Sequence, residues 1–150
     1  MSTESGEVPS GFRALTIGGD FIGVNGPLYV RRVGDRVHLG FRVEKRHTNP
    51  LGICHGGMLA SFCDMLLPFC AHRKSAEVRD RFLPTISLQV DYLAPAPLGA
   101  WVQGEADVLR VTGSLVFAHG LVSVDGATAA RVSGILKIGQ PFHRGPENLG

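Results

Sequence analysis

The longest apolar stretch of the chain runs from Met58 to Ala71, and its only polar side chains are Ser61 and Asp64. A run of that length and composition favours a helix that is buried on all sides. It is too short to cross a bilayer, which needs about 20 apolar residues, so we predict the central helix of a soluble domain. A carboxylate inside a buried helix is costly unless it is paired, hydrated or used in chemistry. Asp64 is therefore the residue to explain.

Extended segments flank this helix on both sides, because apolar and polar residues alternate there with the period of a half-buried strand. They are residues 28–30, 36–43, 83–92, 100–110, 115–124 and 129–138. The alternation places Thr85 and Ser87 on one face of the strand at 83–92. Residues 32–35, Thr112-Gly113 and Asp125-Gly126 are typical hairpin turns between strands.

Short links between the later strands make them antiparallel. One long helix against one twisted sheet is an α+β arrangement, and we expect five to six strands wrapped around the central helix. The single domain is expected over residues 21–139. We expect residues 1–20 to be a partly flexible N-terminal segment, with a short helix or loop at 11–20, and 140–150 to be a loose C-terminal tail. Residues 72–81 are predicted to form a loop.

Composition narrows the function classes. The chain has 150 residues, enough for one sizeable core, and its net charge of +2 is too weak to indicate nucleic-acid binding. Three cysteines and no Cys-x-x-Cys pair predict reduced thiols rather than disulfides or a zinc site. The N-terminus has no secretory pattern. We therefore expect a cytoplasmic protein with no metal and no membrane partner.

A group of polar and glycine-rich motifs surrounds the start of the helix. It comprises His47-Thr48-Asn49, Gly52, His55-Gly56-Gly57, Asp64 and the strand that ends in Tyr92-Leu93-Ala94-Pro95. In this order and spacing the motifs resemble those of hot-dog fold acyl-CoA thioesterases, nearest to the phenylacetate-pathway and thioesterase-superfamily-member-2 branch. The resemblance covers roughly residues 21–138. It implies the hot-dog fold and a homodimer whose sheets join edge to edge, often doubled into a homotetramer.

The resemblance also implies a set of site residues. The asparagine, first motif glycine, helix carboxylate and strand hydroxyl of the family fall on Asn49, Gly56, Asp64 and Thr85, and His55 takes the place of the motif histidine. Ser87 is the alternative to Thr85. For the substrate-binding part of the site we expect two further residues, Gly57 and Ser61.

Thioester hydrolysis needs a polariser for the carbonyl oxygen, a base or nucleophile, and water. The first N–H groups of a helix have no internal partner and carry the positive end of its dipole, and glycine lets a substrate approach the backbone closely. The Gly56 amide is thus a candidate oxyanion donor. Asp64 can activate water or attack the carbonyl directly to form an anhydride, and the sequence does not choose between these.

The spacing of Gly56 and Asp64 adds an argument about assembly. Eight residues span about 12 Å along a helix, whereas each group must lie within roughly 3 Å of its reacting atoms. One thioester cannot meet both groups from the same chain. We therefore predict that active sites are shared across a dimer interface.

The acyl group is not fixed by the sequence, and an aromatic or medium-chain acyl-CoA is expected. The residues that could shape an acyl pocket are Ser61, Phe62, Met65, Phe69 and His72. Coenzyme A enters only as part of the substrate, and several arginines and lysines could meet its phosphates. Two other functions stay open: a hot-dog hydratase or dehydratase that uses His55 with Asp64, and a non-catalytic acyl-CoA-binding protein.

Overall fold

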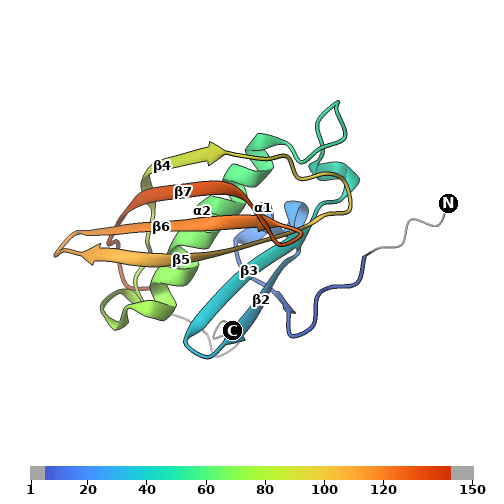
Figure 1. The fold of residues 1–150 in the computed structure, drawn as a ribbon. Coiled ribbons are helices and arrows are strands. Elements are labelled where there is room, and N and C mark those ends of the chain that lie inside the picture. The colour runs from blue at the N-terminus through green and yellow to red at the C-terminus, as the bar shows by residue number, and fades with distance from the viewer. Residues whose placement is uncertain (1–5, 143–150) are drawn as a thin grey trace.

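A single long helix, α2 (Gly56–Lys74), crosses one face of a curved antiparallel sheet (Figure 1). The computed structural model describes residues 6–142. The parts of the predicted terminal segments at 1–5 and 143–150 lie outside these described residues. The remaining elements in chain order are β1 (Arg13–Leu15), α1 (Gly19–Asn25), β2 (Leu28–Val33), β3 (Arg36–Arg42), η1 (Lys45–His47), η2 (Ala76–Val78), β4 (Thr85–Tyr92), β5 (Trp101–Val111), β6 (Leu115–Val124) and β7 (Ala127–Lys137).

The sheet has seven strands in the order β1-β2-β3-β5-β6-β7-β4, and every neighbouring pair is antiparallel. The α+β class is confirmed, but the expected count of five to six strands is too low. The additional strand is β1, which pairs with β2 in the region expected to be a short helix or loop. A short helix does form, but α1 begins only at Gly19, near the end of the segment expected to be a short helix or loop, and extends to Asn25. Strand β4, which follows α2 in the chain, lies at an edge of the sheet beside β7.

The hairpins form where turn residues permit a tight reversal. Asp125 and Gly126, between β6 and β7, have φ angles of 47° and 89°. Positive φ at both central residues is the requirement of a type I′ turn, which matches the twist of the flanking strands. The Asp-Gly hairpin predicted at this point is confirmed, and it sets the register in which Val124 pairs with Ala127.

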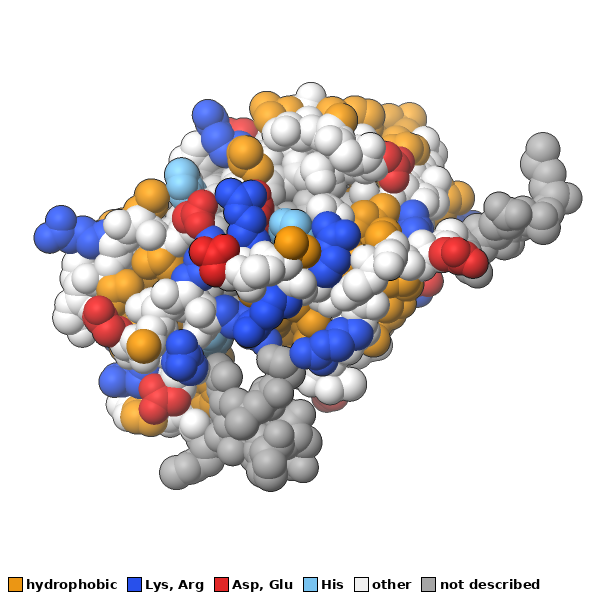
Figure 2. All heavy atoms as spheres, turned by 60° about the horizontal axis from the view of Figure 1, so that its bottom comes forward, with side chains coloured by type: hydrophobic (Ala, Val, Ile, Leu, Met, Phe, Trp, Pro, Cys, Tyr) orange, Lys and Arg blue, Asp and Glu red, His pale blue; other side chains and the backbone are white. Residues whose placement is uncertain are grey.

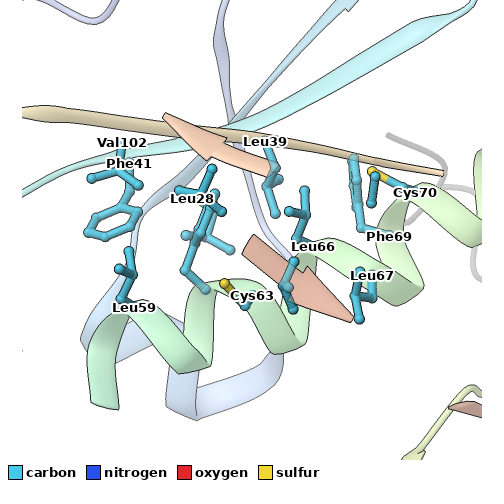
Figure 3. Close-up of a cluster of buried hydrophobic side chains, with 14 of the residues drawn as sticks. Leu28, Leu39, Phe41, Leu59, Cys63, Leu66, Leu67, Phe69, Cys70 and Val102 are labelled. Atoms are coloured by element: carbon cyan, nitrogen blue, oxygen red, sulfur yellow. The ribbon is translucent and has the colours of Figure 1, made fainter. Parts of the chain in front are cut away.

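The core lies between α2 and the sheet. Figure 3 shows α2 side chains, among them Leu59, Cys63 and Leu66, directed toward the strands that carry Leu39, Phe41 and Val102. The helix can sit this close because two strand positions facing it have no side chain. A Cβ on Gly104 would lie 2.7 Å from Leu66 Cδ2, and a Cβ on Gly134 would lie 2.5 Å from Leu67 Cδ1. Larger residues there would push the helix away from the sheet.

The prediction of a helix buried on all sides is wrong for the single chain. One stripe of α2 faces away from the sheet: Gly57 and Asp64 are exposed, and Ser61 and Pro68 are only half-buried. A sheet can cover only one side of a helix, so the opposite side stays open unless another element packs on it. The helix also continues through Pro68 to Lys74, into the segment predicted as a loop, and η2 follows.

Charged side chains of both signs lie on the outside of the molecule. Figure 2 shows Lys and Arg interspersed with Asp and Glu on the face turned toward the viewer. Ion pairs join Arg36 to Glu105 at 3.5 Å and Arg131 to Asp91 at 2.9 Å. Within residues 6–142, no helix combines the length and apolar character that a membrane span requires. The cytoplasmic location stays a prediction.

Candidate active site at the start of helix α2

Among the described residues, the first turn of α2 leaves one backbone amide without a partner. His55 is the N-cap, and its Nδ1 accepts a hydrogen bond of 2.8 Å from the Gly57 N–H. The His55 carbonyl accepts from the N–H groups of Met58 at 3.0 Å and Leu59 at 3.1 Å. The Gly56 N–H makes no hydrogen bond with any residue in the described range 6–142. It is therefore the amide of this turn that can bind an external oxygen, and the positive end of the helix dipole favours an anionic one.

Asp64 lies two turns further along the open stripe of α2 and is bound to the edge strand. The Thr85 hydroxyl, at the start of β4, donates a hydrogen bond of 2.7 Å to Asp64 Oδ1. Because one carboxylate oxygen is held in this way, the other can receive a proton from water or approach a carbonyl carbon. The structure thus brings together two of the predicted site residues that are 21 positions apart in the chain.

The expectation that Ser87 shares a face with Thr85 is wrong. The pairing of β4 with β7 shifts register between Thr85 and Ser87, so that these residues pair with the consecutive partners Leu136 and Ile135. Consecutive residues of β7 point to opposite faces. The bulge therefore turns Thr85 toward the helix and Ser87 toward the other face, which removes Ser87 as an alternative hydroxyl.

Asn49 lies in the loop before α2, where its side-chain oxygen holds the loop together. Asn49 Oδ1 accepts from the Leu51 N–H at 3.0 Å and from the Ile53 N–H at 3.4 Å, and the backbone of Asn49 pairs with Ile53. This is the turn chemistry that asparagine favours. Its Nδ2 group makes no hydrogen bond within the described residues and remains able to donate to a ligand.

A mostly apolar pocket of about 450 Å³ opens along the second half of α2 and begins at Met65, the residue after Asp64. The helix contributes Met65, Pro68, Phe69, His72 and Arg73, and the opposite wall is formed by residues 15–19, 82–83 and 142. Three of the residues expected to shape an acyl pocket therefore lie together. Phe62 does not join them, because it is fully buried in the core beneath the helix.

Ser61 and Gly57 lie nearer the start of α2. The Ser61 hydroxyl donates to the Gly57 carbonyl at 2.8 Å, which ties it to its own helix. Both residues line a second pocket of about 340 Å³, together with His55. The predicted substrate-binding pair is thus placed at the end of α2 that carries the Gly56 amide, away from the apolar pocket.

The cysteines near the site are poor nucleophiles. Burial raises the pKa of Cys63, next to Asp64, to about 12 and that of Cys54 to about 11. The thiolate is the reactive form of cysteine, and at neutral pH almost none of it is present at either position. Asp64 remains the strongest candidate base in this part of the molecule.

One contact that sequence reasoning missed joins β4 to the start of α2. The Tyr92 hydroxyl donates a hydrogen bond of 2.7 Å to the Gly56 carbonyl. Tyr92 belongs to the strand-ending motif quoted above, but no local pattern links it to a residue 36 positions earlier in the chain.

Comparison with known proteins gives a consistent result. Residues 51–129 match the model of the thioesterase superfamily. The chain is 28% identical to human acyl-coenzyme A thioesterase 13, over 70% of this chain and 74% of that protein. It is 25% identical to the solved zebrafish thioesterase superfamily member 2, with a TM-score of 0.68, over 83% of this chain and 88% of the other.

A second solved structure is the BH2602 protein from Bacillus halodurans with CoA. It is 20% identical, with a TM-score of 0.66, over 75% of this chain and 74% of the other. At that identity the likeness concerns the fold. Together these matches confirm the predicted hot-dog fold and the predicted resemblance to this branch of proteins.

Proposed function

Because this chain belongs to the thioesterase superfamily, we propose that it hydrolyses an acyl-coenzyme A thioester to a free acid and coenzyme A. The observation that carries the proposal is the hydrogen bond from Thr85 to Asp64 on the open stripe of α2. It presents a carboxylate held by one oxygen one residue before the apolar pocket begins, in a helix whose first turn has an amide with no partner among residues 6–142. These are the base, the acyl site and the oxyanion donor that the reaction needs.

In this proposal each residue has a separate task. The Gly56 N–H binds the carbonyl oxygen and stabilises the negative charge that it gains in the tetrahedral intermediate. In one route Asp64 removes a proton from the attacking water and passes it to the departing thiolate of coenzyme A. In the other route Asp64 attacks the carbonyl to form an anhydride, the thiolate takes its proton from water, and a second water hydrolyses the anhydride to the free acid and restores the carboxylate. Thr85 orients the carboxylate. The Asn49 Nδ2 group orients the thioester or the water, and His55 holds the first turn of the helix.

The two catalytic groups of one site come from different subunits. Gly56 and Asp64 of one chain are separated by about 12 Å along α2, too far to act on one carbonyl. Strand β4 is paired on one side only and exposes Ile86 and Tyr92, so a second copy can add its own β4 to this edge. A twofold axis there would set the two α2 helices antiparallel, with the start of one beside the middle of the other.

The acyl group that fits this site is aromatic or of medium chain length. The pocket of about 450 Å³ begins at Met65, directly after Asp64, and is lined mainly by apolar side chains. A volume of this order suits a compact apolar group. The CoA moiety is supported by the description of the BH2602 structure as a complex with CoA. A homotetramer stays a prediction.

The hydratase alternative is disfavoured by the position of His55. Its Nδ1 is occupied by the Gly57 N–H at 2.8 Å, at the N-cap of α2. Because Nδ1 is bound as the N-cap acceptor, that nitrogen is not available for acid–base chemistry, whichever subunit supplies Asp64. A protein that only binds acyl-CoA would not need the hydrogen bond that orients Asp64, so the presence of this bond favours catalysis.

The test is a panel of benzoyl-, phenylacetyl-, hexanoyl-, octanoyl- and palmitoyl-CoA with spectrophotometric detection of free thiol. We expect CoA release with the aromatic and medium-chain members, and a loss of about 10³-fold in kcat in Asp64→Asn, a near-isosteric change that removes the base. Asp35→Asn, an exposed carboxylate in the β2–β3 turn, is the matched control. Full activity of Asp64→Asn would contradict the proposal, as would loss of enoyl absorbance without CoA release when crotonyl-CoA, an enoyl substrate, is added to the panel.

A further inference from the structure

The hydroxyl of Tyr92 holds the glycine that carries the proposed oxyanion donor. Tyr92 Oη donates to the Gly56 carbonyl at 2.7 Å. The ring also covers this residue, because a Cβ on Gly56 would lie 3.5 Å from Tyr92 Cζ and 3.6 Å from Cε1. Yet 53% of Tyr92 is exposed in the single chain. Burial in the core of the single chain therefore does not account for the hydrogen bond that Tyr92 makes to the start of α2.

Two successive glycines at the start of a helix need outside restraint. Glycine has the widest backbone freedom of any residue, and the first turn of a helix lacks the hydrogen bonds that fix later turns. Here side chains supply them. The peptide group between Gly56 and Gly57 is held at both ends, its carbonyl by Tyr92 at 2.7 Å and its N–H by His55 Nδ1 at 2.8 Å.

The preceding peptide group is held at its carbonyl end alone. The His55 carbonyl accepts from Met58 and Leu59, while the Gly56 N–H of the same peptide group makes no hydrogen bond within residues 6–142. The direction of this N–H depends on the backbone angles of Gly56, which the Tyr92 contact restrains. An oxyanion donor is effective only when it is oriented before the charge develops.

We propose that Tyr92 is a positioning residue for catalysis, which acts through the Gly56 amide and does not itself touch the substrate. This inference rests on the proposed function. It assigns the edge strand β4 two tasks: Thr85 at its start orients the carboxylate of one active site, and Tyr92 at its end orients the oxyanion donor of the other site of the dimer. Both contacts join β4 to α2, so a shift of this strand would disturb both halves of the catalytic machinery.

The experiment compares Tyr92→Phe with Tyr29→Phe. Tyr29 is the other tyrosine of the chain, and it packs beside Trp101 on β2 and β5 at a ring distance of 5.7 Å. Each substitution removes one hydroxyl. We expect Tyr92→Phe to lower kcat by about tenfold, the worth of one hydrogen bond in the transition state, with KM within about twofold of wild type. Tyr29→Phe is expected to keep the wild-type kcat.

A second readout separates positioning from a structural role. In wild type and in Tyr29→Phe we expect the NMR order parameter of the Gly56 amide to be about 0.85, the value of rigid backbone. In Tyr92→Phe we expect it to fall. Unchanged kcat in Tyr92→Phe would overturn the inference and leave the proposed function intact. A lower melting temperature with unchanged Gly56 order and unchanged kcat would also overturn it. Wild-type protein that releases no CoA would refute the proposed function itself, and this inference with it.

Discussion

Gly56→Pro would delete the proposed oxyanion donor with little other change to the chain. Gly56 is the first residue of α2, the helix position at which proline is favoured and the N–H is not needed for the helix. The preceding residue, His55, has φ −59° and ψ 135°, the extended conformation that a residue before proline adopts. A Cβ on residue 56 meets Tyr92 at 3.5 Å, an ordinary contact distance. The fold should therefore accept this substitution.

The expected loss is large because the donor has no substitute nearby. The Gly57 N–H is bound to His55 Nδ1 and the Met58 N–H to the His55 carbonyl. Removal of one oxyanion-hole donor lowers kcat by about 10² to 10³-fold, or about 2.7 to 4 kcal/mol of transition-state stabilisation. We expect this loss in kcat, measured by thiol release on the best substrate of the acyl-CoA panel. Because proline restricts the unfolded chain, the free energy of unfolding should stay equal or rise slightly.

The matched control is Gly56→Ala, which adds the Cβ but keeps the N–H. The ratio of the two kcat values isolates the amide from the added bulk. A well-folded Gly56→Pro enzyme with the same kcat as Gly56→Ala would refute the role assigned to this amide. Circular dichroism and thermal unfolding of both variants establish that the comparison is made between folded proteins.

Three further predictions concern other parts of the molecule. Thr85→Val keeps the shape of the side chain but loses the hydrogen bond to Asp64. We expect kcat to fall roughly tenfold, which corresponds to about 1.4 kcal/mol of transition-state stabilisation. An unchanged kcat would contradict the role of Thr85 in orienting the carboxylate. Burial lowers the pKa of His47, whose ring accepts from the Glu44 N–H and bonds the Asn25 carbonyl. Its neutral form therefore stabilises the fold above its unfolded pKa of about 6.5. That stability is lost as pH falls through the lower folded pKa, by at most about 1.4 kcal/mol per pH unit. Urea unfolding between about pH 5 and pH 7.5 should show this loss in wild type and not in His47→Gln. Met65→Trp should fill the apolar pocket and lower kcat/KM more for octanoyl-CoA than for acetyl-CoA, and an equal loss for both would place the acyl chain elsewhere.

The sequence predicted the elements with strong periodicity or turn chemistry. The apolar run from Met58 identified α2, and the Asp125-Gly126 turn fixed the last hairpin. Strand β1 was missed, and α1 was placed too early in the chain, because both are short and lie among glycines, where no hydrophobic period can develop. Strand β1 is placed by its pairing with β2, and the end of α1 by the bond between His47 and the Asn25 carbonyl, contacts that local sequence does not encode.

The candidate site shows a similar division. Motif spacing located Gly56 and Asp64, and the structure adds their hydrogen-bond partners. Thr85 was preferred and lies against Asp64, but strict alternation wrongly placed Ser87 on the same face, because a β-bulge interrupts the strand between them. A bulge adds one residue and reverses every later side-chain direction. Tyr92 lies on the face that alternation gives it, but its hydrogen bond to Gly56 depends on how β4 packs against α2, which only the coordinates show.

The predicted burial of α2 failed for a different reason. The apolar composition of a helix predicts that its surface is covered. It does not tell whether the same chain or a second copy of the chain covers that surface. The open stripe carries Ala60, Met65 and Pro68 beside Asp64. Such a mixture on an exposed helix is consistent with a surface that another subunit covers, as the shared-site proposal requires.

The most direct test of that proposal is the activity of a mixed dimer made from Gly56→Pro and Asp64→Asn subunits. The two variants would be co-expressed with different affinity tags, and the heterodimer isolated by sequential purification. If each site takes Gly56 from one subunit and Asp64 from the other, the heterodimer has one intact site and one site with both defects. We predict about half of the wild-type kcat per dimer, with both parent homodimers nearly inactive. A verified heterodimer no more active than its parents would contradict the shared active site.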